Sequence, residues 1–187
     1  MLTVSPAGRE FIAAHEGVVL KAYRCPAGVL TIGVGHTSAA GAPAVTAGMT
    51  ITRAEAFAIL AADLKRFEAR TCNALTVGVV PHQQAAFDGA VSFDFNTGRV
   101  HNATWPKLFA ARKFAEARAS LLTWNKGGGK VLAGLTRRRR EEAALIFDEV
   151  YPAGQASSAA DPVTTGWAQI LIFPQHFRVP RAALTTF

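Results

Sequence analysis

The sequence predicts an α+β fold, because a short β-hairpin pattern near the N-terminus is followed by mainly helical patterns. Residues 18–23 (VVLKAY) and 29–35 (VLTIGVG) are strand-like, and the CPAG segment between them contains the proline and glycine that favour a turn. Helical spacing of apolar residues then recurs between residues 52 and 150. The chain has 187 residues, half of them hydrophobic and 18% charged, which is typical of one globular domain with an appendage.

A first helix is expected directly before the hairpin. Ser5 is a capping residue, Pro6 suits the first helical position, and apolar residues such as Phe11 follow at helical spacing. Gly17 favours the end of this helix. The helix is therefore expected to carry Glu16 in its last turn.

A second helix is expected to begin at Thr52, after a loop over residues 38–48. Thr52 and Glu55 fit the capping box, in which a hydroxyl and a carboxylate each accept a hydrogen bond from a free backbone N–H group of the first turn. The core-facing stripe of this helix has spacings of three and four residues and consists of Phe57, Leu60, Leu64 and Phe67.

Further helices are expected towards the C-terminus. Residues 81–95 are apolar nearly all round, which predicts a buried central helix that ends at residues 96–98 (NTG). Residues 104–122 predict two short helices, and the three glycines at 127–129 predict a break. The last helix is expected over about 136–150, starting at its threonine. Its expected core residues are Ala143, Ile146, Phe147 and Val150.

The character of the chain changes after residue 150. The segment PAGQASSAADP is small and polar, which is typical of a linker, and WAQILIF (residues 167–173) is too short to span a membrane. The sequence therefore predicts a domain over residues 1–150 and a tail over residues 151–187. No motif indicates what the tail does.

Composition argues against several classes of protein. No stretch approaches the ~18 consecutive apolar residues of a membrane helix, and the N-terminus lacks the pattern of a secretory signal. The two cysteines form no disulfide framework, and no Cys or His spacing indicates a metal site. The net charge of +7 attracts anionic polymers, which both bacterial envelopes and nucleic acids offer.

The residues that carry chemistry gather in EGVVLKAYRCPAGVLTIGVGH, residues 16–36. Glu16, Cys25 and Thr31 are spaced by nine and six residues, and a helix end followed by a hairpin would bring them to one cleft. A carboxyl held against apolar surface has a raised pKa, which suits a general acid near neutral pH. Glu16 taken alone is more simply explained as a solvated residue at a helix end.

With this spacing, the stretch resembles the catalytic signature of the phage-type lysozymes, the endolysins of glycoside hydrolase family 24. In that family a glutamate is followed by Asp, or sometimes Cys, nine residues later, by Thr six residues further, and by IGxGH. Here these positions are Glu16, Cys25, Thr31 and the segment ending in His36. The resemblance continues more weakly through ITRAEAF, FDFNTG and GLTRRRREE to about residue 150 and does not cover the tail.

The resemblance implies a lysozyme-like fold, with a small β-hairpin lobe joined by a long helix to a larger, mainly helical lobe. It implies a muramidase that hydrolyses the β-1,4 bond between N-acetylmuramic acid and N-acetylglucosamine, without a metal or cofactor. Glu16 would protonate the leaving oxygen, while Cys25 and Thr31 would handle the water or the intermediate. Expected partners are the glycan strands of peptidoglycan and anionic envelope polymers, with no nucleic acid and no membrane span.

The resemblance also implies how such an enzyme reaches its substrate. It would be made in the cytoplasm of the bacterial host, work as a monomer, and act on the wall after release through a separate holin pore.

Cys25 stands where the family more commonly has an aspartate. No other carboxylate lies between Glu16 and Glu55, so nearby sequence does not supply the usual pair of acids. A thiolate can position or activate water, or attack the anomeric carbon, and Lys21 and Arg24 are close enough in sequence to favour the thiolate. An inert buried cysteine is the plain alternative, but a turn between Arg and Pro is an unusual place for one.

Two further groups have structural explanations. His36 is expected to bond Asp63 of the second helix rather than to act in catalysis. The four arginines at 137–140 can pair in part with Glu141 and Glu142, four residues after the first and second of them. A solvated helix face is the default interpretation of that run.

Two alternatives to the muramidase stay open at the level of sequence. A lytic transglycosylase cleaves the same bond with a single acid/base and forms an anhydro sugar instead of adding water. A basic, non-catalytic binder of wall polymer or nucleic acid on a lysozyme scaffold would explain the missing aspartate, although the intact Glu16 and Thr31 spacing argues against it.

Overall fold

The computed structural model describes residues 2–75 and 84–152, and the chain enters its first helix, α1 (Pro6–Glu16), as the sequence predicts. Ser5 is the N-cap, and its Oγ accepts a hydrogen bond from the Gly8 N–H at 2.9 Å. Gly17 ends the helix with a φ of 84°, which glycine adopts without a steric penalty, and its N–H donates to the Ala13 carbonyl. Both signals that predicted the ends of this helix are confirmed.

A three-stranded antiparallel sheet follows, in the order β1 (Val19–Arg24), β2 (Leu30–Gly33) and β3 (His36–Thr37). The turn between β1 and β2 holds the CPAG segment, where the Gly28 N–H donates to the Cys25 carbonyl at 2.7 Å. The hairpin predicted from the two strand-like runs is therefore present. A short 3-10 helix, η1 (Ser38–Ala40), opens the loop that follows.

The pairing of β1 with β2 contains an irregularity that shortens the hairpin. Val19 pairs with Gly33 and Tyr23 pairs with Thr31, so four steps along β1 are matched by two steps along β2. The two steps on β2 cover roughly 7 Å. The displaced part of β1 instead forms backbone hydrogen bonds with residues 49–51 on its other side.

Helix α2 (Arg53–Leu75) links the sheet to the remaining helices, since it packs against β2 and β3 and also against α3 and α4. The capping box is confirmed: Glu55 Oε2 accepts from the Thr52 N–H at 2.7 Å, and Thr52 Oγ1 accepts from the Glu55 N–H at 3.2 Å. His36 Nδ1 lies 2.9 Å from Asp63 Oδ2, which confirms the predicted pair between β3 and α2. Of the predicted stripe, Phe57 is half-buried, and the buried members are Leu60, Leu64 and Phe67.

Helix α3 (Gln84–Thr97) is the buried central helix that the sequence predicts. Every residue over 85–94 is buried, and the helix packs against α1, α2 and α6. It ends before Gly98, whose φ is 65°. Such a helix supplies side chains to the interior from all sides, so its polar residues must find partners within the protein.

The C-terminal part of the described chain consists of α4 (Thr104–Ala110), α5 (Phe114–Leu122), the small hairpin β4 (Lys126–Gly127) and β5 (Lys130–Val131), and α6 (Ala133–Asp148). Two short helices were predicted for residues 104–122 and are confirmed. Of the three glycines predicted to form a break, Gly127 ends β4, and Gly128 and Gly129 form the turn of the hairpin.

Both ends of α6 differ from the sequence prediction. The helix begins at Ala133, three residues before Thr136, because the Thr136 hydroxyl donates back to the Leu132 carbonyl at 3.1 Å instead of capping the first turn. It ends at Asp148, and Glu149 adopts a left-handed conformation with φ 57°. Val150 was predicted in the core, but it lies beyond the helix and is 55% exposed.

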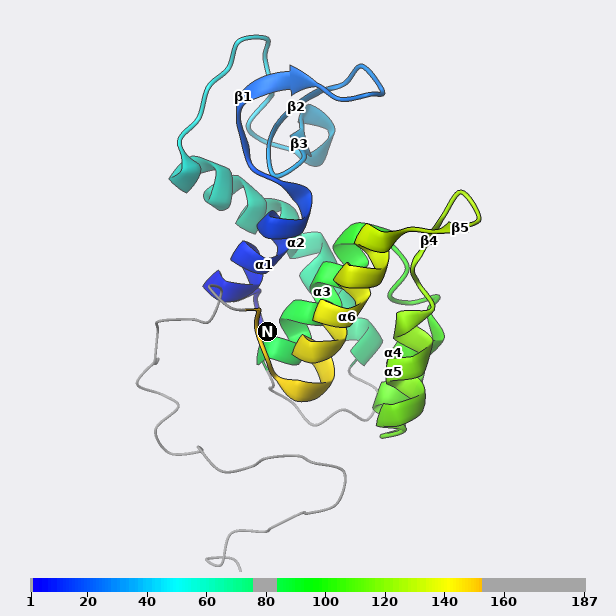
Figure 1. Cartoon of the computed structure of the whole chain (residues 1–187). Helices are drawn as coiled ribbons and strands as arrows, with labels where there is room; N and C mark the ends of the chain where they lie inside the picture. Colours follow the sequence, from blue (N-terminus) through cyan, green and yellow to red (C-terminus); the bar gives the residue numbers. More distant parts are fainter. Residues whose placement is uncertain (1, 76–83, 153–187) are drawn as a thin grey trace, which may run out of the picture. The chain divides into compact units, whose positions relative to one another are not determined.

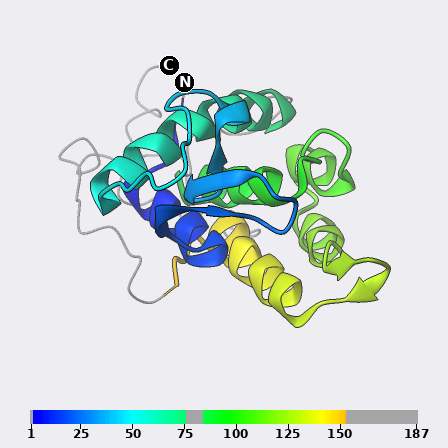
Figure 2. The same cartoon turned by 90° about the horizontal axis from the view of Figure 1, so that it is seen from above.

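Figures 1 and 2 show how these elements lie. The sheet sits at one end of α2 in Figure 1, and α6 lies beside α1 in both views, as their side-chain contacts also show. No helix within residues 2–75 and 84–152 has the length and apolar character needed to cross a membrane. The predicted linker and the WAQILIF segment lie outside the described residues.

Candidate active site

Glu16 is the last residue of α1, and its carboxylate is held by an arginine from α6. Arg138 Nη1 donates to Glu16 Oε1 at 2.5 Å. The Glu16 side chain is still 29% exposed, whereas that of Arg138 is 5% exposed. The apolar surroundings expected for Glu16 are therefore not what the structure shows, because its carboxylate meets a guanidinium on one side and solvent on the other.

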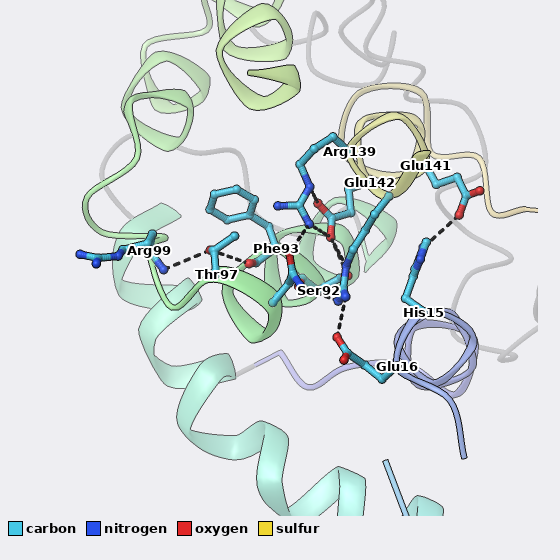
Figure 3. Close-up of polar contacts among 11 residues, drawn as sticks. His15, Glu16, Ser92, Phe93, Thr97, Arg99, Arg139, Glu141 and Glu142 are labelled. Atoms are coloured by element: carbon cyan, nitrogen blue, oxygen red, sulfur yellow. Dashed lines mark hydrogen bonds and ion pairs between the residues drawn. The ribbon is translucent and has the colours of Figure 1, made fainter. Parts of the chain in front are cut away.

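The remaining nitrogen atoms of Arg138 are also engaged. Nε donates to Glu142 Oε1 at 3.1 Å, and Nη2 lies 3.2 Å from both the carbonyl oxygen and the Oγ of Ser92 on α3. Glu142 and Ser92 thus contact this guanidinium through Nε and Nη2, whereas Glu16 contacts it through Nη1. Glu142, Ser92 and Glu16 are labelled in Figure 3. The arginine thus has acceptors for each of its nitrogens, and one of these acceptors is Glu16.

The prediction of a solvated face for the arginine run is wrong for two of its members. Arg138 and Arg139 are buried, and Arg139 Nη2 donates to Asn96 Oδ1 and to Glu142 Oε1. Only the predicted pairing along the helix is confirmed, between Arg137 and Glu141 and between Arg138 and Glu142. A signal was present in the sequence, because helical spacing places Arg138, Glu142 and Leu145 on one stripe.

His15 forms a second tie between α1 and α6. Its Nε2 lies 2.9 Å from Glu141 Oε2, as Figure 3 shows. Burial, followed by the positive charges of Arg138, Arg137 and Arg139, lowers the pKa of His15 to about 4. Although Glu141 alone would favour the protonated ring, the neutral ring donating to Glu141 accounts for the contact near neutral pH.

Cys25 lies in the turn directly after β1. Its backbone N–H donates to the Val29 carbonyl at 3.0 Å. Hydrogen bonds from the backbone of Val29 and Ala27, and then from the Thr31 hydroxyl, lower the pKa of the Cys25 thiol. The cause differs from the one expected, because the Arg24 guanidinium donates to the Gly28 carbonyl at 2.6 Å. The local backbone, not a neighbouring cation, favours the thiolate.

Thr31 is a buried residue of β2, at 4% exposure, and pairs with Tyr23 across the hairpin. Its Oγ1 donates to the Val29 carbonyl at 3.1 Å and also contacts the Cys25 thiol. These two acceptors share one hydroxyl proton. The oxygen lone pairs of Thr31 can therefore accept a hydrogen bond from a bound water.

The structure thus places two of the three sequence-predicted site residues, Cys25 and Thr31, in one hairpin. The Thr31 hydroxyl contributes to the lowered pKa of the Cys25 thiol, while the hydrogen bond of Glu16 goes to Arg138. Two residues, Gly17 and Val18, separate Glu16 at the end of α1 from the start of β1. Within the described ranges, no cluster of three or more His, Cys, Asp or Glu side chains could hold a metal ion.

Comparison with known proteins gives consistent matches. The family model described as phage lysozyme matches residues 13–142. The endolysin of Salmonella phage P22 is 32% identical over 148 residues, which are 78% of this chain and 99% of that protein. The endolysin of Bacillus phage B103 is 33% identical, and the chain spans 54% of that longer protein.

Solved structures match over the same region. An endolysin from the Escherichia coli O157:H7 phage FAHEc1 superposes with a TM-score of 0.70 at 33% identity, covering 81% of this chain and 97% of that one. The muramidase domain of SpmX from Asticaccaulis excentricus superposes with a TM-score of 0.67 at 29% identity, covering 79% and 99% of the two chains.

Proposed function

The chain belongs to the phage lysozyme family, and from this premise we propose that Glu16, Cys25 and Thr31 carry out its glycosidic cleavage. The protein is a glycoside hydrolase of the lysozyme type, an endolysin muramidase that acts on bacterial peptidoglycan. Its fold is the lysozyme-like α+β fold. The assignment of the individual residues is our own.

One observation supports the proposed role of Glu16. The buried guanidinium of Arg138 binds one side of its carboxylate, and the Glu16 side chain remains partly exposed to solvent. A glycosidic oxygen placed over the exposed side would receive the Glu16 proton as the bond to the anomeric carbon breaks. Binding of a sugar there would also exclude water, which disfavours the ionised carboxylate and so favours the protonated acid.

The roles of Cys25 and Thr31 are supported by their position in one hairpin and by the backbone hydrogen bonds around Cys25. The lowered pKa of Cys25 favours a thiolate, which can accept the proton of a water that attacks the anomeric carbon. Thr31 can hold that water through its oxygen. In this scheme water adds across the broken bond, so the product is a reducing sugar. Glu16 is left as the carboxylate and Cys25 as the thiol, and exchange of protons with solvent returns both residues to their starting states.

The test is a turbidity assay on outer-membrane-permeabilised cells with the wild type and Glu16→Gln. Loss of a general acid typically lowers the rate by about 10²–10⁴, with the fold retained. Glu10→Gln is the matched control, because Glu10 is on the same helix and, among the residues that the structure describes, forms its ion pair with the exposed Arg53. More than a third of wild-type activity in a folded Glu16→Gln protein would reject the assignment.

Mass spectrometry of the released fragments tests the chemistry. Hydrolysis gives a reducing end, whereas a transglycosylase gives an anhydro product that is lighter by one water. If most fragments end in an anhydro sugar, the enzyme is a lytic transglycosylase and the muramidase scheme is rejected.

We also propose that the enzyme works as a monomer, is made in the bacterial cytoplasm, and reaches the wall in the periplasm through a separate holin pore. Support comes from the resemblance to the family. Expression in cells with and without a holin tests the route, because lysis that needs no holin would reject it. Light scattering of the purified protein tests the monomer.

A further inference from the structure

Glu142 is a fully buried carboxylate that contacts both guanidinium groups near Glu16. Its Oε1 accepts from Ser92 Oγ at 2.8 Å, Arg138 Nε at 3.1 Å and Arg139 Nη2 at 2.9 Å. Three donors on one oxygen suit a charged carboxylate. Burial raises the pKa of Glu142, and the two arginines and Ser92 oppose that rise.

Burying the charges of Arg138, Arg139 and Glu142 costs free energy that their contacts offset only in part. Arg139 Nε lies 2.8 Å from Glu142 Oε2 without the alignment of a hydrogen bond, and Arg139 Nη1 has no hydrogen-bond partner among the described residues. Buried ion pairs often stabilise a protein no more than well-packed apolar residues of similar volume. Stability alone is therefore a weak explanation for three buried charges on one helix.

We propose that Glu142 is a positioning residue for the hydrolysis, which acts on Glu16 through Arg138. It fixes the Arg138 guanidinium so that Nη1 faces Glu16, and its negative charge offsets one of the two guanidinium charges on that side. The inference rests on the proposed role of Glu16 as the acid.

The geometric part follows from the planar shape of the guanidinium. Glu142 and Ser92 engage Nε and Nη2 of Arg138, which leaves Nη1 directed at Glu16. Without the Glu142 carboxylate, Nε of Arg138 loses its acceptor, and the long side chain is held by fewer contacts. The Glu16 carboxyl would then lose its fixed direction towards the exposed side.

The electrostatic part follows from the charges around Glu16. Helix α1 contributes His15, which is neutral near pH 7 because its pKa is lowered to about 4. On α3, the groups that contact the two arginines are the neutral Ser92 and Asn96. The buried carboxylates of α3, Asp88 and Asp94, bind Ser5 and Arg70 instead. On α6, the exposed Arg137 faces Glu141 at 3.9 Å. The buried charges on α6 are those of Arg138, Arg139 and Glu142.

The net buried charge facing Glu16 is therefore one positive charge, and without Glu142 it would be two. Excess positive charge favours the ionised form of a carboxyl group. A general acid must carry its proton when substrate is bound, so Glu142 extends the pH range over which Glu16 can act.

The experiment compares the pH dependence of kcat for the wild type, Glu142→Gln and Glu141→Gln on purified peptidoglycan. In Glu142→Gln, the fall of kcat at high pH (the alkaline limb of the profile) is expected to move to lower pH by roughly one unit. The rate at neutral pH should fall about 10-fold or more, with KM unchanged because Glu142 does not reach the surface. Glu141→Gln removes the same charge from the preceding residue, whose side chain is partly exposed. It should move the alkaline limb by less than about 0.3 pH unit.

An alkaline limb that stays at its wild-type position in folded Glu142→Gln would overturn the proposal. If that variant fails to fold, Glu142→Asp keeps the charge and shortens the side chain by one methylene. Its kcat should then fall while the limb stays in place, and a wild-type kcat would equally overturn the positioning role. If Glu16→Gln is folded and inactive, the proposed role of Glu16 stands whatever the Glu142 variants show. If Glu16→Gln is active, the roles proposed for Glu16 and for Glu142 are both rejected.

Discussion

Arg138 and Glu16 are 122 positions apart in the chain, yet their Nη1 and Oε1 atoms lie 2.5 Å apart. The neighbouring residues His15 and Glu141 are paired in the same way, so two adjacent side chains tie the last turn of α1 to α6. The direction of the proposed acid is therefore set by a helix from the other end of the described chain.

Two substitutions of Arg138 should distinguish the effect of its positive charge from that of its forked guanidinium geometry. Arg138→Gln leaves Glu142 with one partner fewer and should lower the free energy of unfolding by about 3 kcal/mol. Arg138→Lys keeps the charge without the forked geometry and should lose less stability but much of the activity. Arg137→Gln, on the exposed face, should change stability by less than about 0.5 kcal/mol. Thermal unfolding with lysis assays checks this, and full activity of Arg138→Lys would contradict it.

Cys25 should behave as a functional thiolate. Cys25→Asp should stay active because it restores an anion, whereas Cys25→Ser should lose about 10²-fold or more because a hydroxyl stays neutral. Alkylation should inactivate the wild type. Activity should rise with pH through the lowered thiol pKa and fall again when Glu16 loses its proton, which gives a bell-shaped profile.

Cys72→Ser is the control for the cysteine series and should keep both activity and sensitivity to alkylation. If Cys25→Ala lyses cells as well as the wild type and resists alkylating agents, Cys25 is a bystander. Glu16 would then work with a water held by Thr31 alone.

His15 should make the protein less stable as the pH falls. Its pKa is lowered to about 4 in the folded state from an ordinary value of 6.5, so the unfolded chain binds more protons between these values. The stabilisation is complete above pH 6.5 and is lost progressively down to about pH 4. His15→Gln should remove about 1–2 kcal/mol of this pH dependence, allowing for partial solvent screening. Urea unfolding across this range checks the difference, and identical pH dependence in both proteins would contradict it.

A chain that ends at Pro152 should fold and lyse cells. It keeps Tyr151, whose hydroxyl donates to buried Asp88 Oδ2 at 2.7 Å. A chain that ends at Val150 loses this donor and should be less stable by about 1–2 kcal/mol. Melting temperatures and lysis of the two truncated chains test the domain boundary, which stays a prediction. A much lower melting temperature or poor solubility of the longer one would show that the tail contributes to the fold.

Short-range sequence patterns predicted most of the helices and strands, and they also placed Cys25 and Thr31 in one hairpin. The Ser5 cap, the Thr52 capping box and the Gly17 helix end each depend on atoms within a few residues. The contact between His36 and Asp63 was also predictable, because the motif and the apolar stripe fixed the facing sides of β3 and α2.

The contacts around Glu16 could not be predicted in the same way. The burial of Arg138 depends on α6 packing against α3, and its contact with Glu16 brings together residues 122 positions apart; no short-range pattern states which helices meet. An arginine is usually placed at the surface unless a buried partner is known. The irregular pairing of β1 depends likewise on residues 49–51, which reach it from across a loop.

The long sequence separation between Glu16 and its buried partners also has a consequence during translation. A protein is synthesised from its N-terminus, at about 5–20 residues per second. Residue 16 therefore leaves the ribosome well before residues 138 and 142, and for that interval its carboxyl has neither the arginine nor the glutamate that orient it. A nascent chain that stalls before α6 carries the three proposed catalytic residues without the partners that orient Glu16, so we expect it to lack lytic activity until α6 has been synthesised.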